Sequence, residues 1–224
     1  MKAEQLMFNS ESGNCLVEKF VLGIVGTNCY IVSNIRTKEC FIVDLATYSS
    51  EMVSYINKSR YKVKGILLTH GHFDHIMGTK EFLEDFPVPI YAHQEEREFL
   101  NNPTLNLSIT RSQEYKVSKV EFLSDKEVIN LAGFYIKAIH TPGHTPGGCC
   151  YYLPTEGILF TGDTLFLRSI GRTDFPYGDY DKLIESIKQK LFVLPDNTHV
   201  YPGHADQTYL KVEKLENPYV MMNK

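Results

Sequence analysis

The 224-residue sequence has no tryptophan, no long apolar run and no excess of basic residues. No apolar stretch approaches the roughly 20 residues that a membrane-spanning helix needs, and the N-terminal 14 residues lack the apolar stretch of a signal peptide. Lys and Arg total 23 against 27 Asp and Glu, so the net charge of −4 provides no basic surface for a phosphate backbone. These absences argue against membrane insertion and nucleic-acid binding, and they predict a cytoplasmic protein.

The cysteine count argues against a disulfide framework. There are five cysteines, an odd number, and no pair has the Cys-x-x-Cys spacing of a zinc knuckle or redox site. We expect reduced, mostly buried thiols. Hydrophobic residues make up 43% and charged residues 22%, as in ordinary folded proteins, and no linker or repeat divides the chain. We therefore expect a single domain over residues 1–224.

Hydrophobic patterns alternate between strands and helices along the chain. In the first half they predict strands over 20–34, 39–46, 63–70 and 89–93, and helices over 49–60, 74–86 and 95–100. In the second half they predict strands over 127–133, 134–141, 149–154, 157–166 and 198–204, and helices over 181–192 and 208–216. The segment Gln94–Asp125 gives a weak signal. Two halves with strands first and helices later suggest two sheets packed face to face with helices outside rather than one doubly wound sheet, although periodicity alone does not distinguish the two.

The strongest chemical signal is HGHFDH, residues 70–75, where a buried strand is predicted to end and a helix to begin. His70 and His72 flank a glycine that permits close backbone approach, so both imidazoles can face one cation. Asp74 and His75, on the first helical turn, can reach a second cation. Imidazole and carboxylate ligands suit zinc, manganese or iron. The motif therefore predicts a pair of neighbouring metal ions.

Two protein ligands bind a metal weakly, so other segments must contribute. Three candidates each follow a predicted strand beside a Gly-containing turn: His144 in HTPGHT, Asp163 in FTGDTLF and His204 in YPGH. Side chains at such strand ends converge at the edge of packed sheets. We expect these three residues to complete the metal centre.

The order HGHFDH, HTPGHT, GD and PGH resembles the metallo-β-lactamase superfamily of metal-dependent hydrolases over residues 28–204. The resemblance implies an α/β (α+β) fold, a four-layer αβ/βα sandwich of two mixed sheets flanked by helices. It implies one ligand set for each metal and a bridging carboxylate, with Asp74 and Asp163 also taking part in catalysis. The first set is His70, His72 and His144, the second is Asp74, His75 and His204, and the bridge is Asp163.

Residues 162–175, GDTLFLRSIGRTDF, resemble the glyoxalase II-like (hydroxyacylglutathione hydrolase-like) thioester hydrolases and the related persulfide dioxygenases. The resemblance implies, as the first hypothesis, a dinuclear hydrolase that binds two divalent ions. Zinc is the expected metal, and iron and manganese are the alternatives. A metal-bridging hydroxide would cleave a small-molecule thioester or similar ester. The alternative is a mononuclear iron persulfide dioxygenase, against which Pro202 before Gly203-His204 is the hydrolase-like form. Asp163 stands where zinc β-lactamases typically carry a cysteine ligand, which argues against β-lactam hydrolysis.

Two departures from the family pattern affect these expectations. Asp44-Leu45-Ala46 replaces the usual Asp-Pro-Gly, which affects the turn and no ligand. Only 20 residues follow His204, whereas full-length glyoxalase II has a C-terminal helical domain that grips glutathione. Glutathione specificity is therefore not expected to follow from the resemblance, and the oligomeric state is left open.

Two further residues are candidates for substrate binding. Arg172 either pairs with Asp174 or meets an anionic end of the substrate. Tyr177 either lines the pocket or packs against its neighbours. The three histidines outside the motifs are expected to have structural roles. They are His93, His140 and His199.

Overall fold

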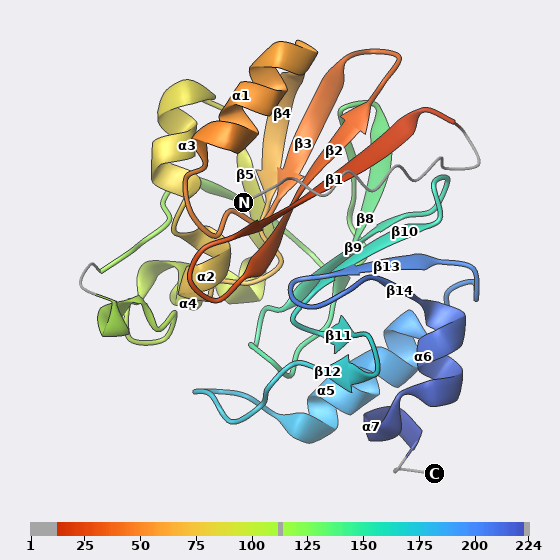
Figure 1. The fold of residues 1–224 in the computed structure, drawn as a ribbon. Coiled ribbons are helices and arrows are strands. Elements are labelled where there is room, and N and C mark those ends of the chain that lie inside the picture. Colours follow the sequence, from red (N-terminus) through yellow and green to blue (C-terminus); the bar gives the residue numbers. More distant parts are fainter. Residues whose placement is uncertain (1–12, 112–113, 222–224) are drawn as a thin grey trace.

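The computed structural model describes residues 13–111 and 114–221, and it contains two six-stranded sheets packed face to face (Figure 1). The first sheet has the order β1 (Cys15–Leu22), β2 (Thr27–Asn34), β3 (Glu39–Val43), β4 (Lys62–Leu67), β5 (Ile90–His93), β6 (Val120–Leu123). The second has the order β14 (Thr208–Tyr209), β13 (His199–Pro202), β10 (Ile158–Gly162), β9 (Cys149–Leu153), β8 (Phe134–His140), β7 (Val128–Leu131). A small hairpin pairs β11 (Leu165–Phe166) with β12 (Ser169–Ile170).

Both sheets are mixed. In the first, β1, β2 and β3 pair in antiparallel fashion, and β3 to β6 run parallel. In the second, β10 and β13 are parallel and the other neighbours are antiparallel. Two separate sheets confirm the predicted arrangement over a single doubly wound sheet.

Helices cover the outer faces of the two sheets (Figure 1). The first sheet is covered by α1 (Ser50–Ser59) and α3 (Thr79–Asp85), and the second by α5 (Tyr180–Ser186), the π-helical turn Ile187–Leu191 and α6 (Leu210–Glu216). Short helices α2 (Phe73–Ile76), α4 (Arg97–Asn101) and α7 (Pro218–Met221) and 3-10 turns at Gln94–Glu96 and Ser108–Thr110 complete the described chain. The layers are helix, sheet, sheet, helix, so the predicted fold class is confirmed.

Strand β2 shows how the sequence builds these layers. All eight of its residues are buried. Side chains alternate along a strand, so Cys29 and Ile31 pack beneath the helices while Tyr30 and Val32 face the second sheet. The centre of the strand, residues 29–32, is the continuous apolar run expected of a strand buried on both faces, whereas its two ends are polar.

The layer between the sheets contains an aromatic cluster of Tyr30, Phe160 and Tyr201. The three ring centroids lie 5.3 to 5.5 Å apart, within the range of favourable aromatic pairs. All three side chains are buried. The Tyr30 hydroxyl donates to the Pro202 carbonyl over 2.7 Å, which ties the first sheet to the second.

Several predicted boundaries were wrong for identifiable reasons. The predicted strand 20–34 is two strands, because Gly23 and Gly26 adopt positive φ in the turn between β1 and β2. The predicted helix 74–86 is broken before α3, because the Gly78 N–H donates to the Leu45 carbonyl over 2.8 Å instead of continuing the helical hydrogen bonds. Gly78 also lies so close to the Thr47 backbone that a Cβ would be 2.4 Å from the Thr47 carbonyl carbon. The helical pattern over 181–192 continues beyond α5 only as the π-helical turn.

The structure also bears on the expectations about cysteines, membrane-spanning helices and domains. All five cysteines are free and buried, as predicted. Within the described residues, no helix has both the length and the apolar character needed to cross a membrane. The expected single domain over 1–224 stays a prediction, since residues 1–12, 112–113 and 222–224 lie outside the described part.

The aromatic cluster predicts a strong local effect on stability. Phe160→Ala removes a fully buried ring, so we expect the free energy of unfolding of the metal-free protein to fall by about 3–5 kcal/mol. Urea denaturation followed by circular dichroism measures this change. Val193→Ala is the control, because Val193 is 72% exposed. Equal stabilities of the two variants would contradict a packing role for the cluster.

Candidate metal centre

The seven predicted ligands converge at one edge of the sandwich from four loops. His70 to His75 follow β4, His144 follows β8, Asp163 follows β10 and His204 follows β13. Their ligand atoms form three overlapping groups, and within each group these atoms lie within 4.8 Å of one another. The groups are His70, His72 and His144; His70, His75 and Asp163; and Asp74, His75 and His204.

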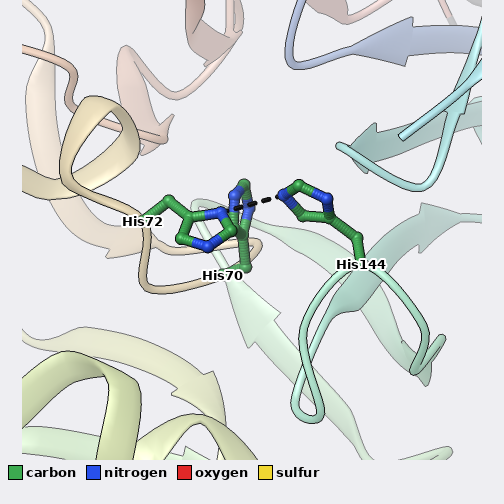
Figure 2. A group of neighbouring side chains, drawn as sticks. All are labelled: His70, His72 and His144. Carbon is green, nitrogen blue, oxygen red and sulfur yellow. Dashed lines mark hydrogen bonds between the residues drawn. The ribbon is translucent and has the colours of Figure 1, made fainter. Parts of the chain in front are cut away.

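The three-histidine group is buried, with its rings turned toward one another (Figure 2). His72 Nδ1 lies 2.9 Å from His144 Nε2. The His70 ring centroid is 4.9 Å from that of His72 and 4.8 Å from that of His144. Three imidazoles from two segments of the chain thus surround one small volume, an arrangement that suits a transition-metal ion.

Asp163 lies between this group and the remaining ligands. Its Oδ1 atom is 3.4 Å from His75 Nε2, and its Oδ2 atom is 3.7 Å from His144 Nε2 and 3.5 Å from His204 Nε2. Asp74 Oδ2 lies 3.2 Å from His204 Nε2 and 3.6 Å from His75 Nε2. The two oxygens of Asp163 therefore face different histidines, as a bridging carboxylate would.

Hydrogen bonds on the far sides of two rings select their tautomers. His75 Nδ1 lies 2.8 Å from Asp44 Oδ2, and His144 Nδ1 lies 2.7 Å from the Arg172 carbonyl oxygen. Carboxylate and carbonyl oxygens only accept hydrogen bonds, so each Nδ1 carries the proton. When these rings are neutral, both Nε2 atoms direct a lone pair into the centre. Metal-binding histidines commonly donate their other ring N–H to a carboxylate or backbone oxygen in this way.

The electrostatics favour neutral imidazoles in the three-histidine group. Burial and the neighbouring His144 lower the pKa of His72 to about 3, and burial lowers the pKa values of His70 and His144 as well. For His75, burial alone would lower the pKa, but Asp44, Asp163 and Asp74 outweigh it and raise the pKa. Neutral imidazole is the form that binds a metal.

The donor atoms themselves indicate that a cation belongs here. The buried atoms His70 Nε2, His75 Nε2 and Asp163 Oδ1 have no hydrogen-bond partner among the described residues. A buried polar atom without a partner is costly, so such atoms in a native protein need an explanation. Metal ions with imidazole and carboxylate ligands provide one, and the residues present fit them.

Asp44 is a contributor that the sequence reasoning did not assign to the site. Its Oδ1 accepts from the Thr69 backbone N–H and its Oδ2 from the Thr69 hydroxyl, each over 2.8 Å, in addition to the bond with His75. Its backbone is left-handed, with φ of 56°. The departure at Leu45-Ala46 therefore leaves a turn that still aims this carboxylate at the metal-binding motif.

Glu96 is a second missed residue, and it joins two loops of the centre. The side chain is fully buried; Oε1 accepts from the Gly71 N–H over 2.9 Å and Oε2 from the Thr145 hydroxyl over 3.0 Å. Burial raises the pKa of Glu96 to about 7, although these donors and the Gly147 N–H oppose the rise. Glu96 thereby holds the loop of His70 and His72 against the loop of His144.

One glycine of the motifs has a clear geometric reason. A Cβ on Gly203 would lie 2.3 Å from Asp163 Oδ1 and 2.7 Å from the His75 ring. Any larger residue would displace two predicted ligands. The Pro-Gly-His sequence was thus a signal for close approach as well as for a turn.

The two tentative substrate residues have different positions. Arg172 lines the cavity over the metal centre, but its guanidinium forms two hydrogen bonds with Asp174, of 2.9 and 2.7 Å. Tyr177 is 65% exposed and lines a neighbouring cavity instead.

The three remaining histidines lie outside the metal-binding groups. His93 stacks on His140 with ring centroids 3.9 Å apart, and His199 stacks on Tyr209 at 4.5 Å. These contacts agree with the structural roles expected of them.

Comparison with known proteins supplies the family. The family model of the metallo-beta-lactamase superfamily matches residues 22–204. The chain belongs to this superfamily. The match includes all seven predicted ligands.

Relatives of similar length support the assignment. The chain is 34% identical to the probable metallo-hydrolase YqgX of Bacillus subtilis over 201 residues, which cover 89% of this chain and 94% of YqgX. It is 34% identical to the hydroxyacylglutathione hydrolase GloC of Haemophilus influenzae over 200 residues, which cover 86% and 92%.

Solved structures share the fold. The crystal structure of BLEG-1 B3 metallo-beta-lactamase superposes with a TM-score of 0.86 at 34% identity, covering 92% of this chain and 99% of that one. The crystal structure of TTHA1623 in a di-iron-bound form gives a TM-score of 0.79 at 29% identity, covering 90% and 98%.

The Asp44 contacts lead to a prediction about metal affinity. Asn tolerates left-handed backbone, but in Asp44→Asn the amide group would face either Thr69 or His75 with a donor where an acceptor is needed. We expect His75 to favour the Nε2–H tautomer in that variant. Zinc affinity of the group containing His75 should then fall roughly 10- to 100-fold, while the three-histidine group keeps its affinity.

Titration of the metal-free protein with zinc against a chelating indicator measures both affinities. Asp85→Asn is the control, because this exposed carboxylate accepts a hydrogen bond from the Tyr48 hydroxyl and lies outside the metal-binding groups. Unchanged affinities in Asp44→Asn would contradict its role in orienting His75.

Proposed function

We propose that the protein is a dinuclear metal-dependent hydrolase that cleaves a thioester or a similarly activated ester of a small molecule. The observation that carries this proposal is the position of Asp163, whose carboxylate lies within 3.7 Å of His144 from the first predicted ligand set and of His75 and His204 from the second. A carboxylate shared in this way supports two neighbouring cations rather than one.

The cavity over the centre supports a substrate with a good leaving group. It has a volume of about 320 Å³, and its ionisable lining residues are predicted ligands and two arginines. The ligands are committed to metal, and arginine does not release its proton at neutral pH. Among the described lining residues there is thus no free general acid. A thiolate leaves without protonation more readily than an alkoxide or an amine, since a simple thiol has a pKa near 8.5.

The chain's own residues hold and orient the reacting groups. Divalent ions, when bound, would supply a hydroxide nucleophile at neutral pH and stabilise the negative charge that develops on the carbonyl oxygen. Asp74 accepts a hydrogen bond of 3.0 Å from the Thr27 hydroxyl, which fixes one carboxylate of the centre. Phe175 lies 5.4 Å from the His72 ring and covers the three-histidine group on the cavity side.

The comparisons support hydrolysis in general and leave the substrate as part of the proposal. GloC, at 34% identity, carries the name of a thioester hydrolase. The di-iron form of TTHA1623 supports two metal positions in this fold and iron as one occupant. Zinc remains our first choice of metal, with iron or manganese as alternatives.

Two other activities are the competing outcomes. Persulfide oxidation by a single iron would leave part of the ligand set unused. β-Lactam hydrolysis is suggested by the likeness to BLEG-1. Its leaving group is an amine nitrogen, for which the lining offers no free acid.

Metal loading and turnover together test the proposal. We expect about two transition-metal ions per chain, because seven ligands exceed what one ion takes from side chains. Chelation should abolish release of free thiol from acyl thioesters, and zinc should restore it. Oxygen uptake with glutathione persulfide and cleavage of a chromogenic cephalosporin are measured on the same zinc- and iron-loaded samples. Oxygen uptake by the iron form with no thioester cleavage by either form would overturn the proposal.

The bridging position of Asp163 gives a separate prediction. Asp163→Ala removes a ligand that follows β10 and leaves the buried strand intact, so we expect thioester turnover to fall at least about 100-fold with the circular dichroism spectrum unchanged. Metal content should drop from two ions toward one. Retained activity with two bound ions would rule out the bridging role.

A further inference from the structure

Two arginines line the cavity over the metal centre, and their surroundings differ. Arg172 is 65% exposed at its side chain and is paired with the carboxylate of Asp174. Its guanidinium carbon also lies 4.2 Å from the Phe175 ring centroid. Its charge is already balanced within its own loop, so it has little to offer a substrate anion.

Arg111 has no such partner. It follows the 3-10 turn Ser108–Thr110 and is partly buried, with its guanidinium carbon 4.5 Å from the centroid of the Phe73 ring. Its buried Nε atom has no hydrogen-bond partner, and no carboxylate lies within ion-pair distance of its guanidinium among residues 13–111 and 114–221. Arginine stays charged at all physiological pH values. Within the described part of the chain, the guanidinium beside the metal centre is therefore not paired with a carboxylate.

We propose that Arg111 binds an anionic group, most simply a carboxylate, on the thioester substrate, so that the enzyme prefers negatively charged thioesters. This inference rests on the proposed function. Phe73, over which Arg111 is stacked, lies between the predicted ligands His72 and Asp74 in the chain. The anion would consequently be bound in the same cavity as the scissile carbonyl.

The geometry of the cavity fits such a substrate. A guanidinium that lines a cavity can donate hydrogen bonds from its terminal amino groups to a carboxylate. Apolar side chains of Val25, Leu107 and Phe166 line the same cavity and suit the carbon chain between the two groups. The remaining carboxylates of the lining, Asp74 and Asp163, are predicted metal ligands and so do not compete for Arg111.

The anion can belong to the acyl half or to the thiol half of the thioester, and three substrates distinguish these sources. The neutral reference is the acetyl thioester of N-acetylcysteamine. The succinyl thioester of N-acetylcysteamine places a carboxylate on the acyl half. The acetyl thioester of 3-mercaptopropionate places it on the thiol half.

The test compares the ratio of kcat/KM values for charged and neutral thioesters. In Arg111→Gln, we expect this ratio to fall roughly 10- to 100-fold for the substrate whose charge reaches Arg111. Arg111→Lys should keep part of the preference, because lysine retains the charge but not the planar fork. Arg36→Gln is the charge-matched control, since Arg36 lies in the turn between β2 and β3, outside the cavity lining. Its ratio should equal that of the wild type.

Either of two results would overturn the inference. One is an unchanged ratio in Arg111→Gln for both charged thioesters. The other is a loss of the preference in Arg172→Gln instead, which would assign anion recognition to the GRTDF loop.

A binding measurement separates this inference from the proposed function. A carboxylate-bearing thioether has no bond that the enzyme can hydrolyse, and its primary amide is the neutral counterpart. We expect the thioether to bind the zinc-loaded wild type roughly 10-fold or more tightly than it binds Arg111→Gln, and the amide to show no such difference. If no thioester is cleaved but this difference is found, the proposed function fails and anion binding by Arg111 stands. If thioesters are cleaved but the difference in binding is missing, the proposed function stands and anion binding by Arg111 is overturned.

Discussion

Burial of imidazoles and carboxylates together at one sheet edge is the constraint on which the rest of the structure depends. His70, His72, His75 and His144 are all at most 4% exposed. Charged imidazoles at this separation would repel one another, and neutral ones leave nitrogen atoms without partners. An unpartnered buried polar group costs about 1–3 kcal/mol. Metal ions relieve this cost, so the arrangement makes folding and metal binding interdependent.

The scaffold holds the site against that cost through polar bonds between the two sheets. The Tyr151 hydroxyl donates to the Leu68 carbonyl over 2.8 Å, just before the metal-binding motif. The Asn28 side-chain amide donates to the carbonyls of Pro202 and Ala205, each over 2.9 Å, on both sides of His204. In each case the donor lies on a strand of one sheet and the acceptors lie at or just after the end of a strand of the other sheet. These hydrogen bonds between the sheets therefore help to fix the positions of the ligand loops.

The sequence was sufficient for features that depend on local pattern and strand ends. The HGHFDH motif was recognised from the sequence as a metal-binding segment between a strand and a helix. His144, Asp163 and His204 were found because each follows an apolar strand at a glycine-containing turn. The succession of strands and helices permitted two facing sheets, and the family resemblance supplied the layer order. The orientation of the rings and their tautomers depends on tertiary contacts, which spacing does not encode.

The missed residues share a physical reason. Asp44 and Glu96 contribute through carboxylates whose partners lie 25 or more positions away in the chain. Arg111 lies in a segment with a weak periodic signal. Its proposed role depends on the lack of a paired carboxylate among the described residues, which the sequence does not reveal. The break before α3 has the same origin, since Gly78 is dictated by the Thr47 backbone and not by the helical pattern around it.

The predicted metal ligands and the residues that line the outer cavity come from different parts of the fold. The ligands come from strand ends that are fixed by the sandwich, whereas the outer cavity is formed by the β1–β2 turn with Val25, by Leu107 and Arg111, and by the loop with Arg172 and Phe175. Asp44, Glu96 and the inter-sheet bonds hold the ligands from behind, so side chains of these outer segments can change while the ligands keep their positions. The contact of Arg172 with His144 is made by a backbone carbonyl and does not depend on the side chain. Relatives at 34% identity with different names are the expected consequence of such a division. Substrate preference should therefore be sought in the outer loops, and the reaction type in the histidines and aspartates beneath them.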